Sequence, residues 1–268
     1  MNDYISLTYL DLVAASVFLL LNALFSILLN LRLERQLLVA SLRMIVQLLM
    51  VGLLLKTVFA ISSPWFTALL ALAMIAFAGR EIRARQERRL IGLWGYSLGA
   101  ASMMMAGTIV TVFALTTQIS PDPWWTPRYA LPLFGMILGN TMTGVSLGLD
   151  TLHSTLHRER IAVEAQLLLG RSRWQAVELA TRRALRSGFT PIINSMAATG
   201  VVSLPGMMTG QILSGVDPQE AVKYQLLIMF LIGGATGLGV LGAVFGSVWR
   251  LTDNRHRLRL DRMQAGSR

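Results

Sequence analysis

The sequence contains no cysteine and few charged residues. Among its 268 residues there is no thiol, so neither a disulfide nor a thiolate metal site can form. Only 14% of the residues are charged, whereas 54% are hydrophobic, and the mean hydropathy is +0.56. Soluble domains rarely combine these values, and long apolar runs of this kind predict membrane-spanning segments.

Three sequence motifs are also absent, and each absence excludes a class of protein. The first residues, MNDYISLTYLD, are acidic rather than basic, so we expect no cleavable signal peptide. No G-x-x-x-x-G-K-[ST] loop occurs, so this chain does not hydrolyse ATP by that route and we expect it to bind no cofactor. The apolar segments contain no Ser/His pair, paired Asp or H-E-x-x-H motif, which disfavours an intramembrane enzyme.

Seven apolar segments approach or reach the length of a membrane span. A helix needs about 20 residues to cross roughly 30 Å of hydrocarbon. The segments are 11–31, 37–59, 64–79, 91–117, 129–149, 189–212 and 224–249. The sequence therefore predicts an all-α integral membrane protein, organised as a single transmembrane domain over residues 1–268.

The basic residues are distributed unevenly between the two sides of these spans. Of 24 Lys and Arg residues, 20 lie in the loops after spans 1, 3 and 5 and in the tail 250–268. Cytoplasmic loops carry the excess of Lys and Arg, so we expect the N-terminus outside and the C-terminus in the cytoplasm. This topology explains the net charge of +10 without nucleic acid as a partner, and we expect a multi-pass protein of the bacterial inner membrane.

One predicted external loop is rich in proline and aromatic residues. Residues 120–129 read SPDPWWTPRY and include Trp124, Trp125 and Tyr129. Aromatic side chains collect at membrane–water interfaces, so an interfacial position is the favoured interpretation. The alternative is an extracytoplasmic lid with an aromatic face.

The predicted cytoplasmic segment 150–188 is long, basic and helical in pattern. The stretch RIAVEAQLLLG continues the helix of span 5 and ends at Gly170, a suitable residue for a helix C-terminus. Ser172 and Gln175 have the spacing of a capping box, which predicts a second, amphipathic helix that ends at Gly188 and Pro191. Such a helix either lies at the lipid interface or docks a cytoplasmic partner, and the pattern alone leaves both open.

Several motifs resemble known transporter families. EAQLLLG at 164–170 resembles the EAA-loop signature of ABC importer permeases, although Gln166 replaces the usual second alanine. With LRMIVQLLMVGLLLK (42–56), FGMILGNTM (134–142) and SLPGMMTGQILSGVDPQEAVKYQ (203–225), the chain resembles the UPF0014 family of FetB-like iron-export ABC transporter permeases. The resemblance extends from about span 2 to span 7.

The resemblance implies a permease that exports iron or a related small substrate and is driven by a separate, FetA-like ATP-binding cassette subunit. ATP would be bound by that subunit. Its docking site would comprise Glu164, Ala165, Gly170, Arg171 and Trp174. Because seven spans are few for a complete transporter, we expect a homodimer. The alternative is a secondary transporter or channel without an ATPase, but almost no Asp or Glu lies within the spans to couple protons.

Polar residues at membrane depth are expensive, so they are candidates for a translocation path. Arg43 and Gln47 lie one turn apart in span 2, Asn140 and Thr141 in span 5, and Asn194 in span 6. Arg43 either snorkels to the interface or faces the path. Because a fixed positive charge repels a bare cation, a path-facing Arg43 would pair with an acid such as Glu81 or contact a chelating anion.

The stretch 203–211 interrupts span 6. Pro205 removes one helical hydrogen bond and frees the carbonyl of Val201, and Gly206 relaxes the backbone further. Broken helices expose backbone oxygens to substrates in many transporters, so we expect a gate near the outer mouth of the path. An ordinary proline kink is the alternative. Side-chain oxygens and thioethers that could contact a cation are provided by Ser203, Thr209, Gln211, Met207 and Met208.

Three further patterns have structural interpretations. His153 and His157 share a helix face, but no third metal ligand is evident, so we expect a hydrated helix end. The methionines of SMMMAG (102–107) point in different directions and indicate flexible packing. Glycines four residues apart in spans 5 and 7 predict close helix packing.

Overall fold

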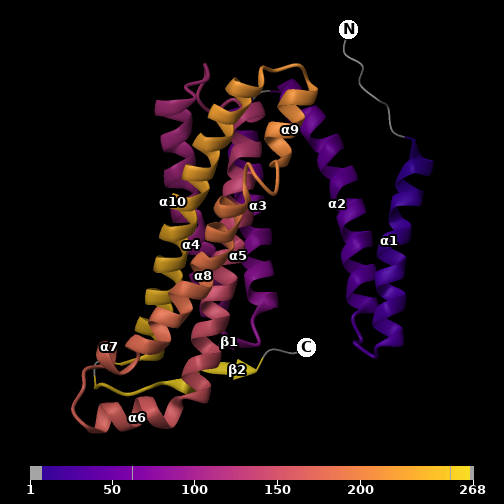
Figure 1. Ribbon diagram of the computed structural model, residues 1–268. Coiled ribbons are helices and arrows are strands. Elements are labelled where there is room, and N and C mark those ends of the chain that lie inside the picture. Colours follow the sequence, from indigo (N-terminus) through magenta and orange to yellow (C-terminus); the bar gives the residue numbers. More distant parts are fainter. Residues whose placement is uncertain (1–7, 62, 254, 266–268) are drawn as a thin grey trace. The chain divides into compact units, whose positions relative to one another are not determined.

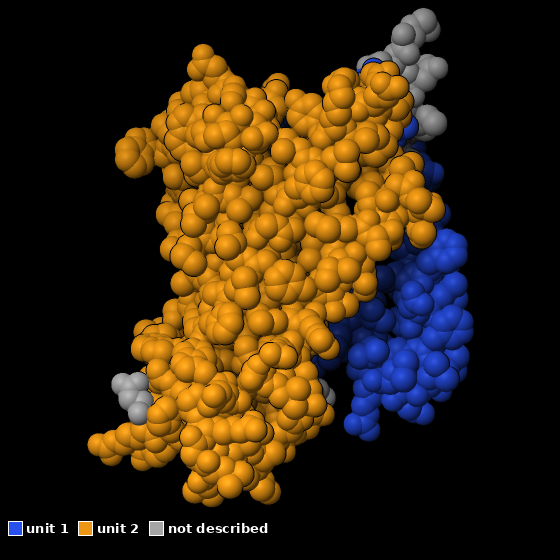
Figure 2. Space-filling view, turned by 60° about the vertical axis from the view of Figure 1, so that its left-hand side comes forward, with its two compact units in different colours: residues 1–62, 213–216 blue, residues 63–212, 217–268 orange. Residues whose placement is uncertain are grey.

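A computed structural model describes residues 8–61, 63–253 and 255–265 (Figure 1). The chain divides into two compact units, which Figure 2 colours separately. Unit 1 comprises residues 1–62 and 213–216, and unit 2 comprises residues 63–212 and 217–268.

Unit 1 contains a hairpin of two apolar helices, α1 (Tyr9–Leu28) and α2 (Glu34–Ile61). Thr8 and Asp11 form a capping box that fixes the start of α1. The turn is held by Ser26, whose hydroxyl donates to the Glu34 carboxylate at 2.8 Å and accepts from the Leu33 N–H at 2.8 Å. Most side chains of the hairpin are exposed and apolar, as expected of helices that face lipid or other protein.

Unit 2 is built around five long helices. These are α3 (Pro64–Arg85), α4 (Trp94–Phe113) with a π-helical extension (Ala114–Gln118), α5 (Pro127–Arg158), α8 (Glu178–Ala198) and α10 (Pro218–Leu251). The helix α5 packs extensively against α3, α8 and α10, and most of its inward-facing residues are buried. It is therefore the centre of unit 2.

Six described helices are long and apolar enough to cross a membrane. They are α1, α2, α3, α4 with its extension, α5 and α10, with mean hydropathies between 1.3 and 2.2. The predicted all-α membrane architecture is confirmed. These helices correspond to every predicted span except the segment 189–212.

The predicted boundary between the amphipathic helix and span 6 is wrong. Instead of ending at Gly188 and Pro191, α8 runs without interruption from Glu178 to Ala198. Gly188 is buried at the contact of α8 with α5 and α10, and Pro191 is accommodated within the helix. Packing against two neighbouring helices thus outweighs the intrinsic tendency of both residues to end a helix.

Span 6 is interrupted, as predicted, but the predicted cause is wrong. The helix α8 already stops at Ala198, and a new helix, α9 (Gly206–Leu213), begins directly after Pro205. In the connecting turn the Gly200 N–H donates to the Ser203 carbonyl at 2.9 Å. Pro205 therefore lies directly before a helix, where its missing N–H breaks no helical hydrogen bond, and it does not kink one.

Three helices of unit 2 approach one another at glycines. A Cβ added to Gly144 of α5 would lie 2.8 Å from the Gly188 carbonyl oxygen of α8 and 2.8 Å from a methyl of Thr236 in α10. A Cβ on Gly239 of α10 would lie 2.5 Å from a methyl of Thr141. The predicted close packing is therefore present at Gly144, whereas Gly139 has no atom within 4 Å of an added Cβ.

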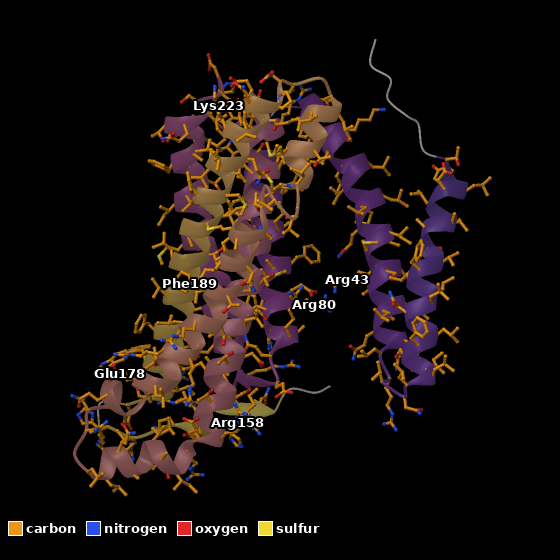
Figure 3. All side chains as sticks on the ribbon, in the orientation of Figure 1. Arg43, Arg80, Arg158, Glu178, Phe189 and Lys223 are labelled. Atoms are coloured by element: carbon orange, nitrogen blue, oxygen red, sulfur yellow. The ribbon has the colours of Figure 1, made fainter. Side chains whose placement is uncertain are left out.

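One end of unit 2 carries short elements that cover the helix ends. The helices α6 (Arg160–Leu168) and α7 (Arg173–Ala176) lie there, with a two-stranded antiparallel sheet of β1 (Arg88–Leu90) and β2 (Met263–Ala265) (Figure 1). Figure 3 shows Arg158 and Glu178 at this end and Lys223 at the opposite end. The described part of the predicted tail, residues 250–253 and 255–265, thus belongs to unit 2, and its strand pairing was not predicted.

His153 joins three elements in the interior of unit 2. It is buried on α5, with Nδ1 3.0 Å from the Arg88 carbonyl oxygen of β1 and Nε2 2.7 Å from the Ser247 hydroxyl of α10. His157 is exposed, and the described residues contain no group of three or more His, Cys, Asp or Glu side chains suited to a metal ion. The expectation of a hydrated helix end is therefore wrong for His153, which is a core residue.

We expect His153→Leu to destabilise the protein by about 1–3 kcal/mol. The change removes both hydrogen bonds and leaves the Ser247 hydroxyl buried without a partner. Thermal unfolding of the purified protein in detergent measures the effect, and His157→Leu at the exposed position is the matched control. Equal melting temperatures for both variants would show that the buried histidine contributes nothing to stability.

Candidate functional site

The helix α8 has the length of a membrane helix but a more polar composition than the other long helices. It has 21 residues, yet it is not among the six helices of sufficient apolar character. Its buried side consists of small and apolar residues, including Ala180, Ala184, Gly188 and Ile192. Its exposed side carries four polar residues spaced by three, four and four positions: Arg183, Arg186, Thr190 and Asn194.

These four side chains form one continuous stripe, because positions three and four apart lie on the same side of a helix. We refer to them as the polar stripe. Arg183 pairs with Glu159 at the end of α5, and the Thr190 hydroxyl donates to the Arg186 carbonyl at 2.8 Å. Thr190 and Asn194 lie within the predicted span 189–212, and polar groups at membrane depth are found against water-filled cavities or protein partners, so the stripe is the strongest candidate for the wall of a path.

The structure separates the two candidate residues of α5. Asn140 is exposed, and its side-chain amide donates to the Met136 carbonyl at 2.8 Å. Thr141 is completely buried, with its methyl against Gly239 and its hydroxyl without a partner. Thr141 therefore belongs to helix packing, while Asn140 remains accessible to a substrate.

The stretch 203–211 also divides into exposed and packed residues. Ser203 and Gly206 are exposed, and Thr209 uses its hydroxyl to donate to the Pro205 carbonyl at 3.1 Å. Met207 packs against a buried cluster that includes Ile228 and Met229. The remaining side chains, Met208 and Gln211, are half-buried, and the Gln211 carbonyl oxygen has no hydrogen-bond partner.

Arg43 and Gln47 lie in unit 1. Both side chains are exposed on α2 and one turn apart, as predicted. Arg43 follows the first residue of α2 by nine positions, which places it about 14 Å along the helix axis.

The segment from α6 to α7 has a helix–turn–helix form, but it does not continue α5 as predicted. The helix α5 ends at Arg158, and α6 begins at Arg160 after Glu159, whose backbone is not helical and whose carboxylate pairs with Arg183 of α8. The predicted second helix is also divided, because Val177 separates α7 from α8.

Gly170, with φ of +85°, ends α6 in a conformation that favours glycine, and Ser172 and Gln175 form the predicted capping box. Trp174 is anchored by the Phe245 ring of α10, with ring centroids 6.3 Å apart. Glu164 pairs with Arg160 at 2.8 Å, and Ala165 and Arg171 are exposed.

Sequence reasoning missed the most exposed apolar side chains of this segment. Ile161, Leu168 and Leu169 of α6 and the following turn are 83%, 89% and 83% exposed. With Ala165 they occupy one side of α6, a pattern that the spacing 161, 165, 168 could have revealed. Exposed apolar side chains gathered on one side of a helix mark an interaction surface for protein or lipid, so we define Ile161, Ala165, Leu168 and Leu169 as the apolar patch of α6.

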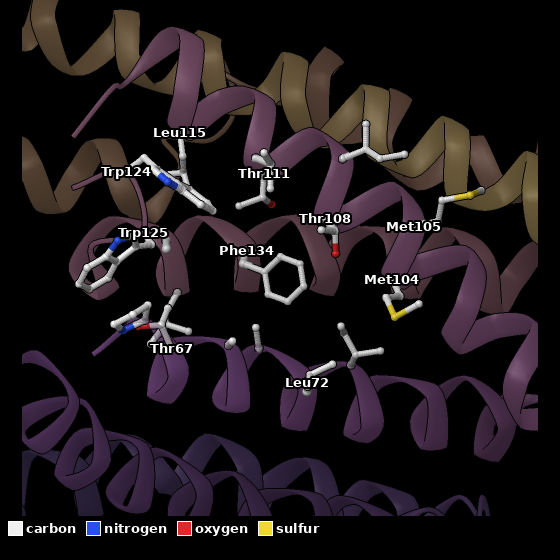
Figure 4. Close-up of a pocket in the computed structure, with 18 of the residues that line it drawn as sticks. Thr67, Leu72, Met104, Met105, Thr108, Thr111, Leu115, Trp124, Trp125 and Phe134 are labelled. Carbon is white, nitrogen blue, oxygen red and sulfur yellow. The ribbon is translucent and has the colours of Figure 1, made fainter. Parts of the chain in front are cut away.

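A large apolar groove lies between α3, α4 and α5 (Figure 4). Its volume is about 1020 Å³, and Trp124 and Trp125 of the proline-rich loop line one end. Among the described residues, three threonines are the polar members of an otherwise apolar and aromatic lining: Thr67, Thr108 and Thr111. Because it lacks charged groups, the groove suits hydrocarbon better than an ion.

Comparisons with known proteins find one matching family and several similar relatives. The profile of an uncharacterised protein family, UPF0014, matches residues 9–251. A UPF0014 membrane protein of Synechocystis sp. is 40% identical over 85% of this chain and 87% of its own length. The relative named probable iron export permease protein FetB, from Escherichia coli, is 31% identical over 85% and 86%. Protein ALUMINUM SENSITIVE 3 of Arabidopsis thaliana is 33% identical over 83% and 80%. No solved structure matches significantly.

Proposed function

Because the chain belongs to the UPF0014 family, we propose that it is the membrane permease of an ABC-type exporter, driven by a separate ATP-binding subunit. A membrane transporter permease accords with the apolar helices and with the relative from Escherichia coli. The export direction, the ATPase and a homodimeric assembly in the bacterial inner membrane are parts of the proposal.

One observation carries this proposal: α8 joins the polar stripe directly to α6, α7 and the turn between them, residues 160–176, which we call the docking segment. Only Val177 separates α7 from the first residue of α8, and the stripe begins five residues later at Arg183. A partner that displaces α7 would therefore move the stripe without an intervening flexible loop. This direct link is what an ATP-driven permease requires and what a gradient-driven carrier does not need.

The charges near the stripe restrict the form of the cargo. Arg183 is neutralised by Glu159, but Arg186 adds a positive charge at the same end of α8. We propose iron or a related small substrate by analogy with the FetB relative. Positive charge disfavours a bare cation, so the metal would pass more readily as a chelate that carries negative charge.

The first test is co-purification of the ATPase with the tagged chain in mild detergent. We expect a Walker-type ATPase with the wild type and its loss from Leu168→Asp, which puts a charge into the apolar patch of α6, and from Gly170→Trp. Glu164→Ala removes the surface ion pair with Arg160 at 2.8 Å and should weaken the complex. The matched control is Glu220→Ala, which removes a similar surface ion pair with Lys223 at 2.6 Å outside the docking segment. Transport by purified vesicles without any ATPase would instead support a gradient-driven carrier.

A further inference from the structure

The C-terminal residues fold back over the end of unit 2. After α10 ends at Leu251, the Leu251 carbonyl accepts from the Arg259 N–H at 2.8 Å. The Asp253 carboxylate accepts from the backbone N–H groups of Arg255 and Arg257 at 3.0 and 2.9 Å, which closes a tight loop. We call the described residues 252–253 and 255–265 the C-terminal hook.

The C-terminal hook is anchored in the same core as the docking segment. Its strand β2 pairs with β1, and Leu258, Leu260 and Met263 pack against the main buried cluster of unit 2. That cluster also contains Val163 of α6 and Ala176 of α7. The hook and the docking segment are thus parts of one packed structure, although about 80 residues separate them in the sequence.

His256 of the C-terminal hook binds the start of α7. Its Nδ1 accepts from the Arg173 N–H at 3.0 Å. The first N–H groups of a helix have no partner within the helix, and the Ser172 hydroxyl accepts from the Gln175 N–H and not from the Arg173 N–H. His256 therefore accepts a hydrogen bond from the Arg173 N–H, which the capping box leaves without a partner. Because α7 is a helix of one turn and would be unstable alone, it depends on such contacts.

The C-terminal hook also extends the basic surface beside α7. Arg255 and Arg257 flank His256 and are exposed, and Arg171 is exposed just before α7. Arg257 pairs with Asp253 at 2.8 Å, so Arg255 and Arg171 supply the positive charge of this face, and the half-exposed Trp174 ring of α7 adds an aromatic group. A protein partner that fits this face presents acidic residues around an apolar recess.

We propose that the C-terminal hook is part of the surface that docks the ATP-binding subunit, with His256 as the positioning residue that holds α7. This inference rests on the proposed function for the identity of the partner. It adds a contribution that does not come from the docking segment itself: the tail sets the position of the helix on which the partner acts.

The first measurement is hydrogen exchange of the purified permease alone. In His256→Ala, amide exchange in residues 172–177 should rise about three- to tenfold, the loss expected for one hydrogen bond, while β1 and β2 stay unchanged. His256→Asn should restore protection, because its side-chain carbonyl accepts a hydrogen bond and asparagine tolerates the φ of +53° at this position. His157→Ala, at an exposed histidine of the same end, is the control.

The second measurement is the affinity of the same variants for the co-purified ATPase. We expect His256→Ala to bind at least fivefold more weakly than the wild type and His256→Asn to bind nearly as well. Unchanged exchange in residues 172–177, or unchanged affinity despite faster exchange, overturns the inference while leaving the proposed function intact. A wild type that binds no ATPase overturns the proposed function itself, and the docking role of the hook with it.

Discussion

Gly144→Ala should destabilise the protein by about 1–3 kcal/mol and sharply reduce the amount of folded permease. The added methyl would lie 2.8 Å from the Gly188 carbonyl oxygen and 2.8 Å from a methyl of Thr236. A backbone oxygen cannot rotate away as a flexible side chain does, so α5 and α8 must separate. Thermal unfolding in detergent and the yield of monodisperse protein measure the loss.

Gly139→Ala is the matched control for this prediction. It is the same substitution on the same helix, but an added Cβ at Gly139 meets no atom within 4 Å. Because alanine has the higher helix propensity, this variant should be as stable as the wild type or slightly more stable. If both variants unfolded at the same temperature, the close approach of the three helices would be disproved.

Asn194→Leu should reduce transport more than tenfold while the protein remains folded. The residue lies on the polar stripe of α8, and leucine would replace a group that can hydrogen-bond to water or substrate with one that cannot. Thr190→Val, which removes a hydroxyl from the same stripe, should act in the same direction but more weakly. Substrate efflux from cells with matched membrane levels of each variant measures both effects.

Thr117→Val separates a role in transport from a local structural effect. Thr117 and Thr190 both donate to the carbonyl four residues earlier, at 2.7 and 2.8 Å, and both are exposed. Only Thr190 belongs to the polar stripe, so only its substitution should slow transport. Increased stability of Asn194→Leu with normal transport would show instead that the stripe faces lipid or a second copy.

The spans and the capped turns were predictable from the sequence because their causes are local. A run of about 20 apolar residues is sufficient to indicate a span. Ser172 and Gln175 lie three residues apart and make their contacts within one turn, and Gly170 adopts its positive φ next to them. The residues that determine these spans and turns are therefore close together in the sequence and can be recognised from it.

The path of α8 and the pairing of the tail could not be read locally. Gly188 and Pro191 have poor helix propensities, and only the contacts with α5 and α10 explain why the helix continues through them. The three residues of β2 pair with β1 across about 170 positions, and no periodic pattern in so short a strand indicates its partner. The sequence also could not show which candidate residues are exposed, because this depends on the neighbouring helices. Asn140 and Thr141 are adjacent in sequence, yet Asn140 is exposed and Thr141 is buried.

Gly188 makes a close contact with α5 and α10 at the middle of α8, and we infer that it acts as a pivot. The residue lies ten positions from each end of the helix, so an arm of about 15 Å extends on either side, and each arm makes a further contact with α5 or α10, at Ala184 and Met196. A force on the α7 end would tilt the helix about this pivot and displace the Ala198 end in the opposite direction. Inward movement at one membrane surface would then accompany outward movement at the other, which is the geometric condition for access that alternates between the two sides.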